Sequence, residues 1–289
     1  MPKSIYEAGL QRLRHPVRPL LSIVEFILHT GAFTSAQEVL EMLPETIETE
    51  TALYNRARQH LQPYLPELEQ FCNPQTEASD TLPLVLGPDG EPLGFTETLA
   101  ALLEQRVLEK ELEQINSLLC GAHNCTLCCT GPDASMRQQY FDIPLRNGEE
   151  ALFAFAKPAQ TGFSDTARQT LETIAAGLNT SCNDAVLARH LQGYSLVLPK
   201  HARCPALDSA GRCSIYEKRP QVCRKPQIFP YLLEQEKEEG LADTGKTVFR
   251  LRNTLLAVMD CPYVQELQDD IALYAAASEL ELIFRRNKA

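Results

Sequence analysis

Two cysteine-rich stretches decide how this chain folds: residues 120–129 read CGAHNCTLCC, and residues 204–224 read CPALDSAGRCSIYEKRPQVCR. A further cysteine, Cys261, stands alone before a proline. Thiolates separated by two residues can reach one metal, because a tight turn brings both sulfurs to the same side. The adjacent pair Cys128 and Cys129 suits a single ion less well, since neighbouring side chains point apart. The spacing therefore favours a metal cluster, or two centres, over one zinc tetrahedron.

The cysteine content and the N-terminus together indicate a compartment. Ten cysteines in 289 residues are too sparse for a disulfide scaffold. Residues 1–18 have no apolar region before a small-residue cleavage site, so we predict no signal peptide. The longest apolar stretch, residues 20–28, is interrupted by Ser22 and Glu25 and is too short to span a bilayer. We therefore expect a cytoplasmic protein with no membrane partner. In the reducing cytoplasm, grouped cysteines indicate metal or redox chemistry.

Charge and composition exclude one class of partner. The chain has 27 Lys and Arg against 38 Asp and Glu, which gives a net charge of −11. A nucleic-acid binder needs clustered basic residues to contact phosphates, so we expect no nucleic-acid partner. Hydrophobic residues make up 44% of the chain, enough for a packed core.

The pattern of apolar residues, glycines and prolines predicts a helix-rich α+β fold in three consecutive parts. We expect a helical N-terminal unit at 1–72, a central α+β part at 81–198 that carries the first cysteine group, and a cysteine-rich segment with C-terminal helices at 199–289. The sequence predicts helices over residues 20–28, 36–43, 51–61, 96–119, 164–191 and 264–288, and a charged helical face over 234–239. It predicts hairpins over residues 82–95, around the turn 87–90, and over 140–156, around the turn 146–149.

Beyond these patterns, the cysteine stretches resemble the YkgJ-type cysteine-cluster proteins, which are described as zinc- or iron-chelating. That family has a Cys-x-x-Cys-x-x-Cys-Cys group followed by a segment like C-x-x-L-D-x-x-G-x-C-S-I-Y-E-x-R-P-x-x-C-R. The second segment is matched here at Cys204, Leu207, Asp208, Gly211, Cys213, Ser214, Ile215, Tyr216, Glu217, Arg219, Pro220, Cys223 and Arg224. In the first group the expected leading cysteine falls at Ala122, between Cys120 and His123, which leaves the fourth ligand open. Between the two groups, residues 140–191 are similar in patterning to the closing half of a GAF domain.

The resemblance implies a bound metal, held by thiolates that converge from both stretches. The candidate metal ligands are Cys120, Cys125, Cys128, Cys129, Cys204, Cys213, Cys223 and Cys261, the last being equally well explained as a buried thiol. Thiolate ligation suits an iron–sulfur cluster, 4Fe-4S, and zinc alike. Arg219 and Arg224 are candidate supporting residues around such a cofactor, because guanidinium groups offset the negative charge of thiolates. Cys72 and Cys182 are expected to be core thiols, and His123 and His201 are more simply bystanders than ligands.

The sequence leaves three functions open. The first is a redox- or metal-sensing or regulatory role, with a protein partner as one option. The second is a cluster-dependent enzyme that modifies a protein, since flagellin lysine methylases have a comparable cysteine arrangement. The third is a purely structural zinc site. Catalytic signatures of other kinds are missing: the chain has no phosphate-binding glycine loop, no Gly-x-Ser-x-Gly and no His-Glu-x-x-His.

Overall fold

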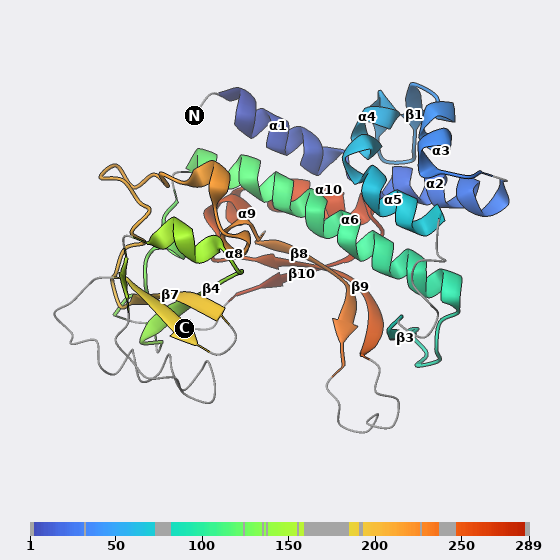
Figure 1. The fold of residues 1–289 in the computed structure, drawn as a ribbon. Coiled ribbons are helices and arrows are strands. Elements are labelled where there is room, and N and C mark those ends of the chain that lie inside the picture. The colour runs from blue at the N-terminus through green and yellow to red at the C-terminus, as the bar shows by residue number, and fades with distance from the viewer. Residues whose placement is uncertain are drawn as a thin grey trace. The chain divides into compact units, whose positions relative to one another are not determined.

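The computed structural model is a mixed helix and sheet fold, which confirms the α+β prediction (Figure 1). It describes residues 3–31, 33–72, 82–123, 125–134, 136, 138–154, 156–158, 185–190, 193–225, 227–236 and 247–286. The contacts of the chain divide it into two compact units. Unit 1 contains Met1–Leu119 and Pro226–Arg286, and unit 2 contains Cys120–Lys225. The second unit is thus inserted in the sequence of the first, and the three-part division stays a prediction.

The N-terminal part of unit 1 is mainly helical, as predicted. Its helices are α1 (Lys3–Arg14), α2 (Arg18–Thr30), α3 (Ala36–Met42), α4 (Ala57–Leu61) and α5 (Leu65–Cys72). Two of these details differ from the sequence prediction. Helix α1 lies before the first helix that the sequence predicts individually, at residues 20–28, but within the predicted helical unit 1–72. The predicted helix at 51–61 is helical only as α4, since Leu53–Asn55 forms strand β2, which pairs with β1 (Thr46–Glu48).

Unit 1 also contains a sheet centred on the long strand β9 (Val248–Val258) (Figure 1). Strand β8 (Ile228–Gln235) pairs with it antiparallel along one side. On the other side, β3 (Leu84–Leu86) and β10 (Glu281–Arg285) both pair with it in parallel, β3 with its beginning and β10 with its end. Helix α6 (Phe95–Cys120), predicted from its apolar stripe, contributes Val107, Leu108, Leu112 and Ile115 to the core shared with this sheet.

Several C-terminal predictions are wrong in detail. The tail has helices α9 (Pro262–Glu266) and α10 (Gln268–Ala277), but it ends in strand β10 rather than in a helix. Glu234 and Gln235 belong to strand β8 instead of a charged helix.

The hairpin at 82–95 is confirmed as a tight turn, since the Gly87 N–H donates to Glu91 O at 2.8 Å and the Leu93 N–H to Val85 O at 2.8 Å.

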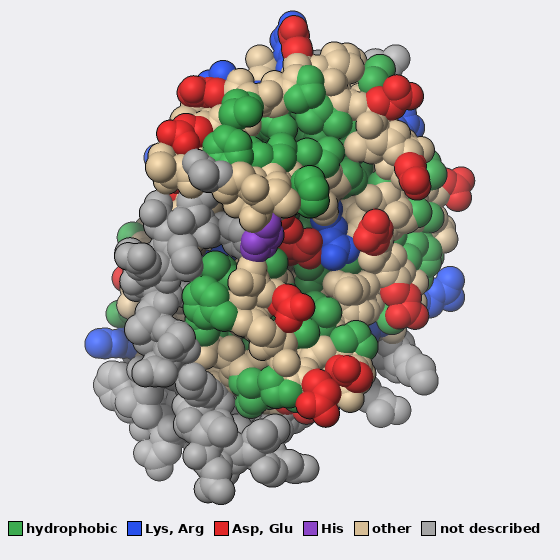
Figure 2. All heavy atoms as spheres, turned by 90° about the vertical axis from the view of Figure 1, so that its right-hand side faces the viewer, with side chains coloured by type: hydrophobic (Ala, Val, Ile, Leu, Met, Phe, Trp, Pro, Cys, Tyr) green, Lys and Arg blue, Asp and Glu red, His purple; other side chains and the backbone are tan. Residues whose placement is uncertain are grey.

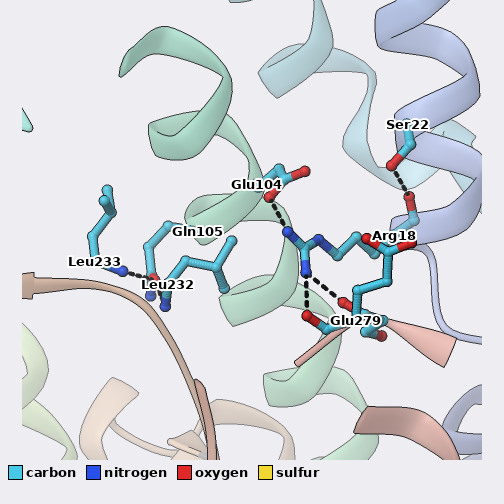
Figure 3. Close-up of polar contacts among 8 residues, drawn as sticks. Arg18, Ser22, Glu104, Gln105, Leu232, Leu233 and Glu279 are labelled. Atoms are coloured by element: carbon cyan, nitrogen blue, oxygen red, sulfur yellow. Dashed lines mark hydrogen bonds and ion pairs between the residues drawn. The ribbon is translucent and has the colours of Figure 1, made fainter. Parts of the chain in front are cut away.

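Gln105 on α6 compensates an irregularity in β8. The register of β8 against β9 shifts between Tyr231 and Leu233, which removes partners from the β8 backbone. The Gln105 amide nitrogen donates to Pro230 O at 2.8 Å. The Gln105 amide oxygen accepts the N–H groups of Leu232 at 2.9 Å and Leu233 at 3.2 Å (Figure 3). The Gln105 side chain therefore replaces main-chain hydrogen bonds that β8 lacks at the register shift.

Arg18, at the start of α2, joins three elements of unit 1 (Figure 3). Its guanidinium donates to the carbonyl oxygens of Ser278 and Glu279, just after α10, and to the Glu104 carboxylate of α6 at 2.9 Å. The Arg18 and Glu104 side chains are only 12% and 14% exposed. Arg18 therefore neutralises a largely buried carboxylate and satisfies carbonyls at a helix C-terminus.

A second carboxylate of α6, Glu111, is buried in unit 1. It accepts the Tyr274 hydroxyl at 2.7 Å and the Val17 N–H at 2.9 Å. Burial raises the pKa of Glu111 to about 7, although these two hydrogen bonds lower it in part. Burial, together with the nearby Glu104, likewise raises the pKa of Glu25 to about 8, while Arg18 lowers it.

Because the pKa values of these two glutamates are raised, we expect unit 1 to lose stability as the pH rises. A carboxyl whose pKa is raised by folding stays protonated in the folded chain while the unfolded chain has released its proton. Stability should therefore fall from about pH 4.5 to about pH 7 for Glu111, and on to about pH 8 for Glu25. For Glu111 the difference is at most about 3 kcal/mol.

Urea unfolding at pH 5.5 and pH 8 measures this difference. The variant Glu111→Gln carries no charge; its amide oxygen can accept the Val17 N–H and its amide nitrogen can donate to the Tyr274 hydroxyl oxygen, so it should show a smaller loss between the two pH values. Glu109→Gln, on an exposed position of the same helix, is the matched control and should behave like the parent. Equal losses in Glu111→Gln and the parent would contradict the assignment.

Unit 2 is built on a small sheet with the strand order β4-β7-β6-β5. Strand β4 (Tyr140–Leu145) pairs antiparallel with β7 (Gly193–Pro199), which pairs antiparallel with β6 (Val186–His190). Strand β5 (Lys157–Pro158) pairs with β6 in parallel. The inner face of this sheet packs against the cysteine segments, because Ile143, Leu145, Leu196 and Leu198 share a core with Cys204, Cys213 and Cys223.

Two predictions within unit 2 are wrong. The hairpin expected at 140–156 does not form, since Glu149–Phe153 is a short 3-10 helix and β4 pairs with β7 instead. The helix expected over 164–191 does not reach its predicted end, because residues 186–190 form strand β6. Residues 164–184 of that predicted helix lie outside the described residues.

Within the described ranges, no helix combines the length and the apolar character needed to cross a membrane. Figure 2 views the side on which the N-terminal helices lie in Figure 1. In that view, the basic side chains of the described residues are scattered singly among acidic and hydrophobic ones.

Candidate metal centre

The two cysteine stretches run side by side in unit 2, joined by backbone hydrogen bonds. The Cys204 N–H donates to Cys129 O at 2.7 Å, the Gly131 N–H to Ala202 O at 2.8 Å and the His201 N–H to Pro132 O at 3.0 Å. Thr130 and Arg203 form an antiparallel bridge between them. Cysteines more than 70 residues apart in sequence are therefore brought together by main-chain pairing.

Gly131 allows this close approach. A Cβ atom built on Gly131 would lie 1.8 Å from the carbonyl oxygen of Pro199 and 2.8 Å from that of Leu198. Both are backbone atoms at the end of β7, so they cannot rotate away. A glycine is required here by space, since no other residue fits between the two segments.

The segment from Cys204 to Ser214 is a compact turn that explains much of its motif. The Asp208 carboxylate accepts the N–H groups of Ala210 at 2.9 Å and Arg212 at 2.8 Å, which lowers the pKa of Asp208. Gly211 has φ +78°, a left-handed conformation that glycine adopts without strain. The turn pairs Leu207 with Cys213 and so returns the chain to within a short distance of Cys204.

The segment that follows places Arg219 beside the thiols. Its guanidinium lies 3.7 Å from the centre of the Tyr216 ring and donates to Tyr216 O at 2.8 Å, and the residue is only 7% exposed. The charge of Arg219 lowers the pKa of Cys120 and of Cys223, against the larger opposing effect of burial. Arg219, which the sequence predicts as a supporting residue around the cofactor, is therefore positioned to offset thiolate charge.

The next element, the short helix α8 (Gln221–Arg224), carries Cys223 and Arg224. Its first N–H, that of Gln221, donates to the Glu149 carboxylate at 2.8 Å. The Tyr216 hydroxyl accepts the N–H of Gly121, which connects this part of the chain to the end of α6. Glu149 and Gly131 are functional positions that the sequence prediction missed, because each acts through a partner about 70 residues away.

Seven of the eight predicted ligands lie in unit 2, and they are close enough to perturb one another. Desolvation by the surrounding protein is the largest cause that raises the pKa of five of these thiols, and neighbouring cysteines raise it further; the five are Cys120, Cys128, Cys129, Cys204 and Cys223. Desolvation by the surrounding protein, together with the charges of Cys120 and Cys125, raises the pKa of Cys128 to about 11. The pKa of Cys223 rises to about 12 through burial and the charges of Cys204, Cys213 and Cys128. The same causes raise the pKa of Cys129, to which Cys204, Cys128, Cys223 and Cys213 contribute.

Two of these sulfurs accept backbone hydrogen bonds. The Leu127 N–H donates to Cys125 Sγ at 3.4 Å, and the Ala206 N–H donates to Cys204 Sγ, which lowers the pKa of Cys204 against the effect of burial. In both cases the donor is two residues after the cysteine. Such bonds stabilise a thiolate and orient it, as the hydrogen bonds around metal ligands do.

The donor set fits a metal that prefers sulfur. Seven thiols share one region, and each raises the free energy of a neighbouring thiolate, so a bound cation would relieve this repulsion. Within the residues that the structure describes, however, no three His, Cys, Asp or Glu side chains are arranged to hold one ion together. Binding would therefore require thiol side chains to turn toward the metal.

The remaining candidates are placed differently. Cys261 precedes α9 in unit 1 and is buried in the core of that unit, whereas the other seven candidate ligands belong to unit 2. His201 is exposed and has φ +60°. Cys182 lies outside the described residues, and the structure describes only the backbone of Cys72, at the end of α5.

Comparison with known protein families agrees with this geometry. Residues 119–244 match the model of the CxxCxxCC family, described as a "Putative zinc- or iron-chelating domain". The match confirms the prediction of a cysteine-cluster domain over this range and supports metal binding there. The YkgJ-type identity and the GAF-like stretch stay predictions. No curated protein and no solved structure is similar enough to the chain to match it.

Proposed function

We propose that unit 2 binds a 4Fe-4S cluster, or else zinc, through thiolates drawn from its seven cysteines, in a redox- or metal-sensing or regulatory role in the cytoplasm. The observation that carries the proposal is the backbone pairing of residues 129–132 with 201–204, which brings both cysteine groups into one region. The reducing cytoplasm would keep these thiols available for a metal.

The spacing of the cysteines, rather than their number, favours a cluster over a single zinc ion. A structural zinc and a 4Fe-4S cluster each take four thiolates, so either would leave three of the seven over. The adjacent residues Cys128 and Cys129 also suit a centre with more than one metal atom. When bound, a cluster would supply a reversible one-electron change, and Arg219 would offset the negative charge of its thiolate ligands. Cys261, in the core of unit 1, is not part of the proposed ligand set.

Anaerobic purification with iron, zinc and sulfide analysis tests the cofactor. A broad visible absorption band with matching amounts of iron and sulfide is expected. Colourless protein with one or two zinc ions would contradict the proposed cluster. Cys129→Ser and Cys204→Ser should each lose most of the metal, since both lie where the segments pair. Cys261→Ala is the matched control and should retain it. Loss of metal in Cys261→Ala with retention in Cys129→Ser would contradict the proposed ligand set.

The regulatory role is tested by comparing loaded and metal-free protein. Removal of the metal should loosen the pairing of 129–132 with 201–204, which amide hydrogen exchange of these backbone groups measures. It should also change which proteins the chain retains when it is used as bait. If the loaded and metal-free proteins show identical amide exchange and identical protein binding, the metal site has no sensing role.

A second candidate function is a cluster-dependent enzyme that modifies a protein substrate. It is favoured by one observation, the exposure of Cys128 together with its neighbour Leu127, which is 45% exposed. A cluster held there would have an edge that a substrate can approach. Turnover of a lysine-containing protein by the loaded chain, absent from Cys128→Ser, would support it.

A further inference from the structure

Strand β10 forms an open edge of the unit 1 sheet. It pairs with β9 along Glu281–Arg285, and no other described strand pairs with it. Two of its large hydrophobic side chains are exposed, Ile283 at 43% and Phe284 at 39%. An edge strand of this kind is a template for another strand, and proteins normally blunt such edges with charges, bulges or prolines.

The direction of the β10 backbone groups follows from one bond. The Met259 N–H donates to Arg285 O at 2.8 Å, so the carbonyl of Arg285 faces β9. Because main-chain groups alternate along a strand, those of Glu281 and Ile283 also face β9, and those of Leu282 and Phe284 face the open edge. A strand that docks on this edge must therefore bond to Leu282 and Phe284.

The sequence of β10 is complementary to itself in reverse. It reads ELIFR, with an acidic residue at one end, a basic residue at the other and three apolar residues between. Two such strands aligned antiparallel about Ile283 place Glu281 opposite Arg285, and Leu282 opposite Phe284. In this register the open-edge groups of Leu282 and Phe284 face their counterparts, and the Glu281–Arg285 and Ile283–Ile283 pairs are non-hydrogen-bonded, with closer side chains.

The geometry points to a homodimer in which β10 pairs antiparallel with β10 of a second copy, extending the unit 1 sheet across a two-fold axis. Two ion pairs flank an Ile283–Ile283 contact on the exposed face of the sheet, and Leu282 packs against Phe284 on the other face. A parallel pairing in register would instead set Glu281 against Glu281 and Arg285 against Arg285, which opposes it. This inference does not depend on the bound metal.

Charge exchange between the two ends of β10 tests the register. The parent chain should have twice its 32.3 kDa mass in light scattering or sedimentation, in a concentration series that reaches about 100 µM, since small interfaces are weak. Glu281→Arg and Arg285→Glu alone should each be monomeric, because each sets like charges opposite one another. The double variant Glu281→Arg/Arg285→Glu should dimerise again, and an equal mixture of the two single variants should form a mixed dimer.

The controls separate this dimer from other associations. Circular dichroism of each single variant should match the parent, and recovery in the double variant shows that the single changes act at the interface. A parent chain that stays monomeric through the concentration series overturns the proposal. So does a dimer that survives Glu281→Arg, or a mixture of single variants that stays monomeric. Capture of a different protein by β10 in place of a second copy would overturn it as well.

Discussion

Replacing Gly131 with alanine is expected to destabilise unit 2 by about 3 kcal/mol or more, near the upper end of the cost of overpacking. The added Cβ would lie 1.8 Å from Pro199 O, and neither the end of β7 nor the segment beside it can move without breaking a hydrogen bond. The paired segments 129–132 and 201–204 should separate. Faster amide exchange at His201 and Cys204, and weaker metal binding, measure the effect.

Gly148→Ala provides the matched control in the same unit. Gly148 has φ +93°, but a Cβ there would meet no atom within 4 Å. Its cost is the left-handed backbone alone, about 1 kcal/mol. Equal losses for the two variants would show that the close approach to Pro199 does not constrain Gly131.

Replacing Arg18 with methionine is expected to cost unit 1 about 3–5 kcal/mol, the usual penalty for leaving one partner of a buried ion pair uncompensated. The methionine fills similar space, but Glu104 would then lie near Glu25 without the opposing charge. The carbonyl oxygens of Ser278 and Glu279 would also lose their donor. The free energy of unfolding in urea measures this loss.

Two comparisons show whether the buried charge is responsible. Arg14→Met removes the pair between Asp270 and Arg14, whose own side chain is 45% exposed, and it should cost less than about 1 kcal/mol. The double variant Arg18→Met/Glu104→Met should recover much of the loss, because it removes both buried charges. A double variant no more stable than Arg18→Met would show that the carbonyl contacts dominate.

The sequence predicts the elements whose signal is local. The apolar stripe of α6 and the glycine turn at 87–90 are both present as expected. The pattern predicts helix over the ELIFR strand because α10, just before it, is a true helix and five residues carry little periodicity of their own. The pattern predicts helix over residues 186–190 for the same reason, although they pair with β7 as a strand.

The same distinction, between local sequence signals and contacts made only in the fold, holds for the candidate site. The residue types that would bind a metal are visible in the sequence, because cysteine spacing is itself the signal. Their supports are not, since Gly131 is required by Pro199 and Glu149 binds the start of α8, contacts that exist only after folding. The location of Cys261 in the core of unit 1 could not be read from its sequence neighbours either.

The insertion of unit 2 within unit 1 sets an order of events during synthesis. All of Cys120–Lys225 leaves the ribosome before β8, β9 and β10 exist, so unit 2 can fold and acquire its ligand first. The N-terminal helices and α6 must wait, with apolar surface uncovered, until the last strands arrive. A chain that stops near residue 226 would carry every proposed ligand and yet lack most of the sheet that completes its first half.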